Sequence, residues 1–352
     1  MPRKDNNAFY LIRYFAAFCV MCLHFTGYMR IRVPDHFGTI SVFRSAIDFY
    51  QPTVILFAIS GFLISASLER SGPDAAAFFK KRFLRLYPEL WLSMAVYLGV
   101  LFLVVPKKFD LSIIPWIFIQ GVGFAQTPYC MEKFATGSIN GPIWYITVII
   151  QLYILIFLFK LITKNSKSPL LYGVTCFILS LGNIAAFFCK DSLSEMGQKI
   201  LERSFIPYAV WFFIGVLCQT LRLYNRNYTN LVLAILLMLH SVIRITRFGD
   251  QGYYTGLITG MAAAAIAVLA AHLIQPDKFK PFIKKLLSPL EKIDITYGMY
   301  LYHWLFLNLL LHYKLYDKYH WTVCFLMYLA ATLIFAYASH KVCKVIMSSI
   351  KR

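Results

Sequence analysis

Residues 8–28 read AFYLIRYFAAFCVMCLHFTGY, an apolar run in which Arg13 and His24 are the only basic side chains. About 17–25 mostly apolar residues suffice for a helix to cross the hydrocarbon core of a bilayer. The stretch therefore predicts a membrane span that carries two polar groups. The chain begins with basic residues but shows no small-residue cleavage site, so we expect an uncleaved first span rather than a signal peptide.

The composition is typical of a protein with many membrane spans. Of its 352 residues, 59% are hydrophobic and 14% are charged, and the mean hydropathy is +0.62. Soluble domains average about 45–50% apolar and about 25% charged residues. In a soluble protein, a net charge of +19 would indicate binding to nucleic acid. In a membrane protein, an excess of Lys and Arg instead marks the cytoplasmic loops. We expect the lipid bilayer as a partner and no nucleic acid.

Ten stretches have the length and hydropathy of a span. They are residues 8–28, 50–68, 88–105, 143–163, 169–188, 205–223, 229–247, 253–275, 297–313 and 321–345. The segment 111–125 is shorter and contains Pro115, so we expect a re-entrant or interfacial segment there.

The distribution of basic residues supports ten spans. With a cytoplasmic N-terminus, 21 of the 35 Lys and Arg residues fall in inner segments and 13 in outer ones. If 111–125 were also a span, every later loop would lie on the opposite side of the membrane, and most of the basic residues would then lie outside. We therefore predict an all-α fold: a polytopic membrane helix bundle of about ten transmembrane helices with both termini cytoplasmic. The chain 1–352 is expected to form a single domain.

Cys19, Cys22 and His24 together suggest a metal, haem or redox site. A helix turns about 100° per residue, so Cys19 and Cys22 are neighbours whereas His24 points away from Cys22. Haem attachment also requires the histidine directly after the second cysteine, and Leu23 intervenes. We expect both cysteines to be packing residues and predict no metal site.

Arg13 and His24 are eleven residues apart, which leaves them about 20° from each other on one helix face and about 16 Å apart along the axis. An arginine inside a membrane span is costly and should face the bundle interior, a cavity or a partner. A snorkelling arginine and a hydrogen-bonded core histidine are the simpler alternative. We favour a functional pair.

The segment SGPDAAAFFKKRFLRLYPELW (71–91) is basic and amphipathic. Asp74 is a predicted N-cap, residues 74–87 are expected to form a short interfacial helix, and Pro88 is expected to kink or end it. Arg82 and Arg85 lie three residues apart and therefore side by side. Guanidinium groups suit phosphate oxygens, although a basic membrane anchor has the same composition.

The chain resembles the acyltransferase-3 family of integral-membrane proteins, which mostly O-acetylate sugars and polysaccharides. Five features match in order over residues 8–345. They are Arg13 with His24, Ser60-Gly61-Phe62, Arg82-Phe83-Leu84-Arg85-Leu86-Tyr87-Pro88, WYITVIIQLY (144–153) after Asn140-Gly141-Pro142, and YGMYLYHW (297–304) with Tyr300 and His303. Many members carry a Glu in the Trp…Tyr helix, where this chain has Ile149, Ile150 and Gln151. The chain is more similar to the single-domain branch.

The resemblance implies a membrane-bound O-acyltransferase in the cytoplasmic (inner) membrane of a bacterium. It implies acetyl-CoA or another acyl-CoA as the donor substrate, with no permanently bound cofactor, and a glycan or lipid-linked sugar as the acceptor. His24 is then the general base. We expect Asp48 to orient His24, through an antiparallel hairpin of the first two spans.

The remaining residues are assigned to substrate binding. Arg82, Arg85 and Lys81 are expected to hold the CoA phosphates, beside Tyr87, and Arg13 is expected to line the path of the donor. Trp144, Tyr145 and Gln151 are candidates for the cavity wall, with a packing role as the alternative. His303, with Tyr300, is assigned to the donor path because its position along its span predicts a depth nearer to that of Arg13 than to that of His24.

A transporter or flippase for a glycan or lipid intermediate is the main alternative function. Buried Arg and His side chains also mark substrate or proton paths. Inverted repeats and paired broken helices favour a transporter, and the sequence shows no clear pair of these.

Overall fold

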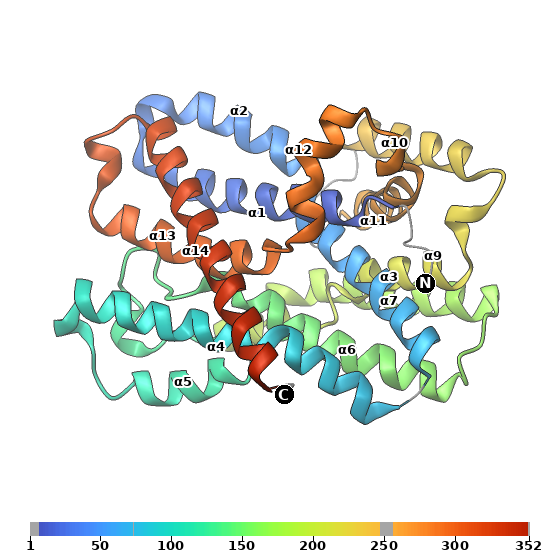
Figure 1. Cartoon of the computed structure of the whole chain (residues 1–352), viewed down its shortest axis with the longest axis horizontal. Coiled ribbons are helices and arrows are strands. Elements are labelled where there is room, and N and C mark those ends of the chain that lie inside the picture. The colour runs from blue at the N-terminus through green and yellow to red at the C-terminus, as the bar shows by residue number, and fades with distance from the viewer. Residues whose placement is uncertain (1–6, 73, 247–255, 351–352) are drawn as a thin grey trace. The chain divides into compact units, whose positions relative to one another are not determined.

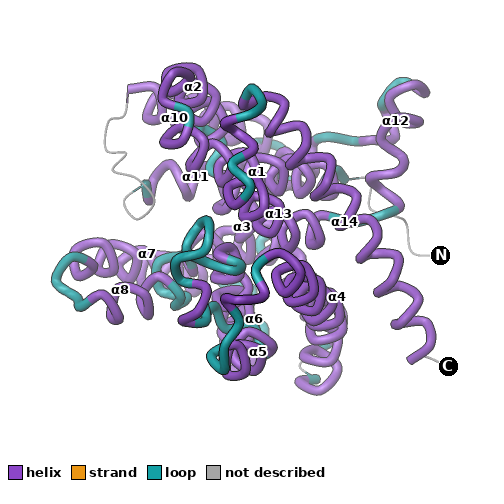
Figure 2. Tube along the Cα trace, turned by 90° about the vertical axis from the view of Figure 1, so that its left-hand side faces the viewer, coloured by secondary structure: helices purple, strands orange, loops and turns teal. Residues whose placement is uncertain are grey.

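The computed structural model describes residues 7–72, 74–246 and 256–350. Within these ranges the secondary structure is helical and contains no strand (Figures 1 and 2). The fold class predicted from the sequence, an all-α membrane protein, is confirmed to this extent.

The described residues fold into α-helices that are joined by loops and 3-10 turns. Their bounds are α1 Phe9–Arg32, α2 Phe37–Asp48, α3 Pro52–Ser71, α4 Ala75–Val104, α5 Ile113–Gly121, α6 Trp144–Ile162, α7 Pro169–Lys190, α8 Glu195–Glu202, α9 Ala209–Thr220, α10 Thr229–Thr246, α11 Leu257–Leu273, α12 Pro281–Lys292, α13 Thr296–His312 and α14 Trp321–Ile350.

Seven segments of the described chain are long and apolar enough to cross a membrane. They are Phe9–Arg32, Pro34–Ser71, Ala75–Val104, Gly141–Ile162, Pro169–Lys190, Thr229–Thr246 and Trp321–Ser349. The other three predicted spans contain α9, α11 and α13, which have 12, 17 and 17 residues. The first three residues of the predicted span 253–275 lie outside the described ranges. The number ten and the sides of the termini stay predictions.

Side-chain caps fix the starts of several helices. The carboxylate of Asp74 accepts a hydrogen bond from the backbone N–H of Ala77 at 3.1 Å, which confirms the predicted N-cap of α4. Ser168 and Ser194 cap α7 and α8 in the same way. Each cap satisfies a backbone donor that has no partner inside the helix.

The prediction of a separate helix at 74–87 was wrong. α4 runs without interruption from Ala75 to Val104, with Pro88 inside it. Proline removes one helical hydrogen bond, but membrane helices tolerate this loss because neighbouring groups compensate for it. The segment 111–125 contains only the nine-residue helix α5, which is too short to cross a bilayer.

The chain divides into two compact units. Unit 1 consists of residues 1–16, 49–78 and 148–293, and unit 2 consists of residues 17–48, 79–147 and 294–352. Three of the boundaries fall inside helices α1, α4 and α6 rather than in loops. Each unit therefore combines segments that are far apart in the sequence.

Two glycines let the backbones of α3 and α9 touch in unit 1. A Cβ atom added to Gly61 would overlap the carbonyl oxygen of Phe212, and one added to Gly215 would overlap the carbonyl oxygen of Ala58. Small residues at such crossings allow close helix packing within a membrane. This explains the glycine of the Ser60-Gly61-Phe62 motif as a packing requirement.

We expect Gly61→Ala to destabilise the protein by about 1–3 kcal/mol, because the added methyl group meets backbone atoms that cannot move aside. Thermal unfolding of the detergent-solubilised protein measures the effect. Gly99→Ala is the matched control, since a Cβ atom at Gly99 meets nothing within 4 Å. Equal melting temperatures for the two variants contradict the packing role.

Candidate functional site

Two histidines form a direct hydrogen bond in unit 2. Nδ1 of His24, on α1, lies 2.8 Å from Nε2 of His303, on α13, and the two ring planes are 3° apart. His303 is fully buried, at 0% exposure, whereas His24 is partly exposed. His24 is therefore the more accessible ring of the pair.

The contacts of His303 fix the tautomers of the uncharged pair. Its Nδ1 lies 3.0 Å from the carbonyl oxygen of Met299, and a carbonyl oxygen only accepts hydrogen bonds. Nδ1 of His303 therefore carries the proton, and its Nε2 accepts one from Nδ1 of His24. This leaves Nε2 of His24 with a lone pair, which is the form that a general base requires.

His303 is a hydrogen-bond partner of His24 that the sequence analysis did not predict, since it had expected Asp48 in that role. We expected His303 at the depth of Arg13, and its hydrogen bond to His24 corrects that placement. Membrane helices tilt, so positions counted along two different helices do not give their relative depth. Asp48 is exposed at the end of α2 and interacts electrostatically with Arg44. A catalytic role for Asp48 stays a prediction.

Aromatic rings line one side of the histidine pair. Trp304 meets His24 edge to face at 5.1 Å between ring centroids, and Tyr28 meets Trp304 at 5.7 Å. The indole N–H of Trp304 donates to the carbonyl oxygen of Ser138 at 3.1 Å. A Cβ atom added to Gly141 would lie 2.6 Å from the indole, so the glycine before the Trp144 helix makes room for this ring.

Asn308 secures the loop that holds the indole. Its amide group donates to the carbonyl oxygens of Ser138 and Ile139 at 2.9 and 3.1 Å, and its side-chain oxygen accepts from Thr136 at 2.7 Å. Asn308 is fully buried. It lies five residues after His303 on α13, and the motif-based analysis of the sequence missed it.

Arg44 is a second residue that the sequence analysis missed. Its guanidinium donates to the carbonyl oxygen of Leu23 and lies 3.5 Å from the hydroxyl of Thr26. It also interacts electrostatically with His24. The sequence analysis did not predict the helix α2 and therefore gave no reason to single out Arg44.

Arg13 lines a cavity in unit 1. The cavity has a volume of about 860 Å³ and also contacts α3, α9 and α11. This agrees with the expectation that a charged side chain in a span faces a cavity. Arg13 shares α1 with His24 but belongs to the other unit. Their common role stays a prediction.

The basic residues of α4 differ in their surroundings. Arg82 as a whole residue is 9% exposed. The side chain of Arg85 is 60% exposed, and its guanidinium lies 3.5 Å from the carboxylate of Asp294. Lys81 is exposed. Arg85 thus forms an ion pair with Asp294.

The other predicted site residues have packing contacts. The hydroxyl of Tyr87 donates to the carbonyl oxygen of Val122 at 3.0 Å, which ties α4 to the segment after α5. Tyr300 donates to the carbonyl oxygen of Pro142, and its ring lies 5.5 Å from that of Tyr145.

Gln151 holds a loop of unit 1. Its amide nitrogen donates to the carbonyl oxygen of Arg203 at 2.7 Å, and its oxygen accepts from the backbone N–H of Phe205 at 3.1 Å. These two bonds fix the approach to α9. Trp144 is partly exposed at the start of α6, and a contact of either side chain with a substrate stays a prediction.

Cys19 and Cys22 are fully buried, at 0% exposure. The described residues contain no group of three or more His, Cys, Asp or Glu side chains arranged to hold a metal ion. The two cysteines have the surroundings of small apolar packing residues.

Comparisons with known proteins match almost the whole chain. The family model described as an acyltransferase domain matches residues 6–341. The chain is similar to nodulation protein 10 of Rhizobium leguminosarum bv. viciae, with 29% identity over 324 residues, which cover 87% of this chain and 84% of that protein. No solved structure matches the chain.

The tautomer of His24 is testable without substrate. We expect ¹⁵N NMR of histidine-labelled protein in detergent to show His24 protonated at Nδ1 and unprotonated at Nε2 at neutral pH. In His303→Leu, the acceptor for Nδ1–H is lost, and we expect a mixture of both tautomers. A His24 signal that is protonated at Nε2 alone in the unsubstituted protein contradicts the arrangement.

Proposed function

Since the chain belongs to the acyltransferase-3 family, we propose that it moves a short acyl group, such as acetyl, from acyl-CoA to a sugar hydroxyl. The acceptor is a surface glycan or a lipid-linked sugar. The observation that carries this proposal is the pair of His24 and His303, which leaves Nε2 of His24 as a proton acceptor on a partly exposed ring.

The proposed reaction proceeds by direct transfer. Nε2 of His24 takes the proton from the acceptor hydroxyl while the oxygen of that hydroxyl attacks the carbonyl carbon of the thioester. The carbon–sulfur bond then breaks, and the imidazolium of His24 returns the proton to the leaving CoA sulfur. The products are an acyl ester and free CoA, and His24 ends in its starting form. His303 acts as a positioning residue, because it holds the Nδ1–H of His24 throughout.

Arg44 is proposed to stabilise the charge that develops during this step. Attack on a thioester places negative charge on the carbonyl oxygen, and preorganised cations or N–H donors lower the energy of that state. The bond from Arg44 to the carbonyl oxygen of Leu23 anchors its guanidinium to the residue beside His24. Its positive charge therefore stays next to the base.

The aromatic rings beside His24 suit a sugar acceptor. A pyranose ring has apolar C–H faces and polar hydroxyl edges, and aromatic side chains pack against such faces while their polar atoms stay bonded elsewhere. Trp304 has its indole N–H engaged by Ser138. Trp304 and Tyr28 are therefore proposed to position the sugar whose hydroxyl meets His24.

The donor is proposed to bind through its phosphates. Arg82, Arg85 and Lys81 remain the predicted phosphate contacts on α4, and Arg13 remains the predicted contact in α1. Arginine and lysine form charge-assisted hydrogen bonds with phosphate oxygens. The exposed position of Arg85 leaves it accessible to a ligand from solution.

We expect His24→Ala to reduce acyl transfer by about 10²–10⁴-fold, the range that a general base contributes. Mass spectrometry of surface glycans measures transfer, in cells that lack the gene and carry each variant. The double variant Cys19→Ala/Cys22→Ala is the control and should keep transfer.

Two outcomes contradict the proposal. A loss of acylation in the cysteine variant together with full activity of His24→Ala restores a metal or redox role for the first helix. Disappearance of the whole glycan from the surface, with normal acylation of the glycan retained inside the cell, supports a transporter instead.

A further inference from the structure

A second pocket of unit 1 lies between the C-terminal end of α3 and the C-terminal end of α6. We call it the α3–α6 pocket. Its volume is about 340 Å³, and ligand sites typically have about 300–1,000 Å³. Apolar surface comes from Leu68, Phe157 and Leu161, and polar groups come from Lys160, Lys164 and Asn165. The lining thus combines a greasy part with two ammonium groups.

The pocket lies where the sequence predicts the cytoplasmic surface of the bilayer. The distribution of Lys and Arg assigns residues 69–88 and 160–168 to cytoplasmic segments, and these segments begin at the ends of α3 and α6. Leu161 is 50% exposed and the adjacent Ile162 is 78% exposed. Exposed side chains of this kind on a membrane helix are matched by lipid tails. We therefore expect the pocket at the depth of the lipid headgroups.

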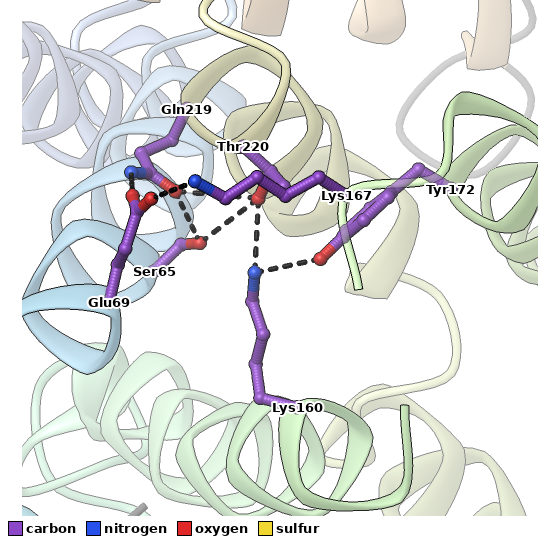
Figure 3. A network of polar contacts seen from close by, with 7 residues as sticks. All are labelled: Ser65, Glu69, Lys160, Lys167, Tyr172, Gln219 and Thr220. Atoms are coloured by element: carbon purple, nitrogen blue, oxygen red, sulfur yellow. Dashed lines mark hydrogen bonds and ion pairs between the residues drawn. The ribbon is translucent and has the colours of Figure 1, made fainter. Parts of the chain in front are cut away.

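Lys160 is a buried cation in the wall of this pocket. The residue is 7% exposed, and its side chain extends from α6 toward two hydroxyl groups (Figure 3). Nζ donates to the hydroxyl of Tyr172 at 2.7 Å and to that of Thr220 at 3.1 Å. Both of these partners are neutral. An ammonium group has three N–H donors, so these two bonds leave one donor for a ligand.

The carboxylate of this network is bonded elsewhere. One oxygen of Glu69 lies 2.6 Å from Nζ of Lys167, and the other accepts from the amide nitrogen of Gln219 at 2.6 Å (Figure 3). Glu69 acts on Lys160 only electrostatically. Among the described residues, Lys160 forms no ion pair. A buried charge without an ionic partner is costly, and inside membrane proteins such residues mark functional sites.

The turn after α6 brings a second lysine to the same pocket. Lys164 and Asn165 have φ values of 48° and 55°, in the left-handed region, which few residues other than glycine adopt. The backbone N–H of Asn165 donates to the carbonyl oxygen of Lys160 at 2.8 Å and closes the turn. Lys164 is exposed. Together with Lys167, three lysines therefore surround a region that contains the single carboxylate of Glu69, and the surplus charge is positive.

We infer that the α3–α6 pocket binds one anionic phospholipid of the cytoplasmic leaflet. The lipid phosphate accepts hydrogen bonds from Lys160 and Lys164, and the side-chain amide of Asn165 is a further donor. An acyl chain of the lipid packs against Phe157 and Leu161. The choice of ligand follows from charge, because anionic lipids gather in the cytoplasmic leaflet and basic pockets between helices bind their headgroups. This inference does not depend on acyl transfer.

The test is native mass spectrometry of the full-length protein in detergent, titrated with phosphatidylglycerol or with phosphatidylcholine of the same acyl chains. We expect one phosphatidylglycerol to bind more tightly than phosphatidylcholine. Lys160→Met should weaken its binding by about 10-fold or more, as the loss of a charge-assisted hydrogen bond predicts. Lys164→Gln should weaken it by about 5-fold, the contribution of one lysine near an anionic lipid surface.

Lys344→Gln is the matched control, because Lys344 is an exposed lysine of α14 on the same predicted side, outside the pocket. Its affinity for phosphatidylglycerol should stay unchanged. Lys164→Gln decides the test alone if Lys160→Met fails to fold, since Lys164 is exposed and lies outside the network of Figure 3.

Three results overturn the inference. The first is equal affinity for the two lipids, and the second is unchanged binding of phosphatidylglycerol in Lys164→Gln. The third is displacement of the bound phosphatidylglycerol by inorganic phosphate at equal concentration, which indicates a site for a free anion rather than for a lipid.

Discussion

A polar side chain inside an apolar helix must find its hydrogen-bond partner on another segment, and this constraint organises the structure. Leaving a buried donor or acceptor without a partner costs about 1–3 kcal/mol. His24 meets this constraint through His303, and Asn308 meets it through the loop around Ser138. The same bonds that satisfy these groups also fix their orientation. Packing and the candidate chemistry therefore share one set of contacts in unit 2.

Local patterns predicted much of the fold. The length and hydropathy of the apolar runs indicated helices at α1, α3 and α6, and Asp74 correctly marked a helix start. Pro88 misled the prediction, because the tolerance of α4 for a missing hydrogen bond depends on its neighbours. The helix α2 was missed as well, since a loop between two spans shows no hydropathy signal strong enough to indicate a helix.

The individual residues of the candidate site were predictable from the sequence, but the contact between His24 and His303 was not. The sequence singled out both His24 and His303, yet 279 residues separate them, and no periodicity relates positions so far apart. Depth along separate helices was a poor guide because helices tilt. Arg44 lacked any motif, and its contact with the carbonyl oxygen of Leu23 becomes visible only when α2 folds back onto α1.

The threading of the chain through both units has a consequence for biosynthesis. His24 leaves the ribosome 279 residues before His303, which follows only after the segments of unit 1 up to residue 293 have been synthesised. During that interval the imidazole of His24 lacks the hydrogen-bond partner that it has in the finished protein. The helix α1 then carries a polar group that its later partner has not yet satisfied. Proteins generally fold their early segments first, but here the polar group of α1 receives its partner only from α13.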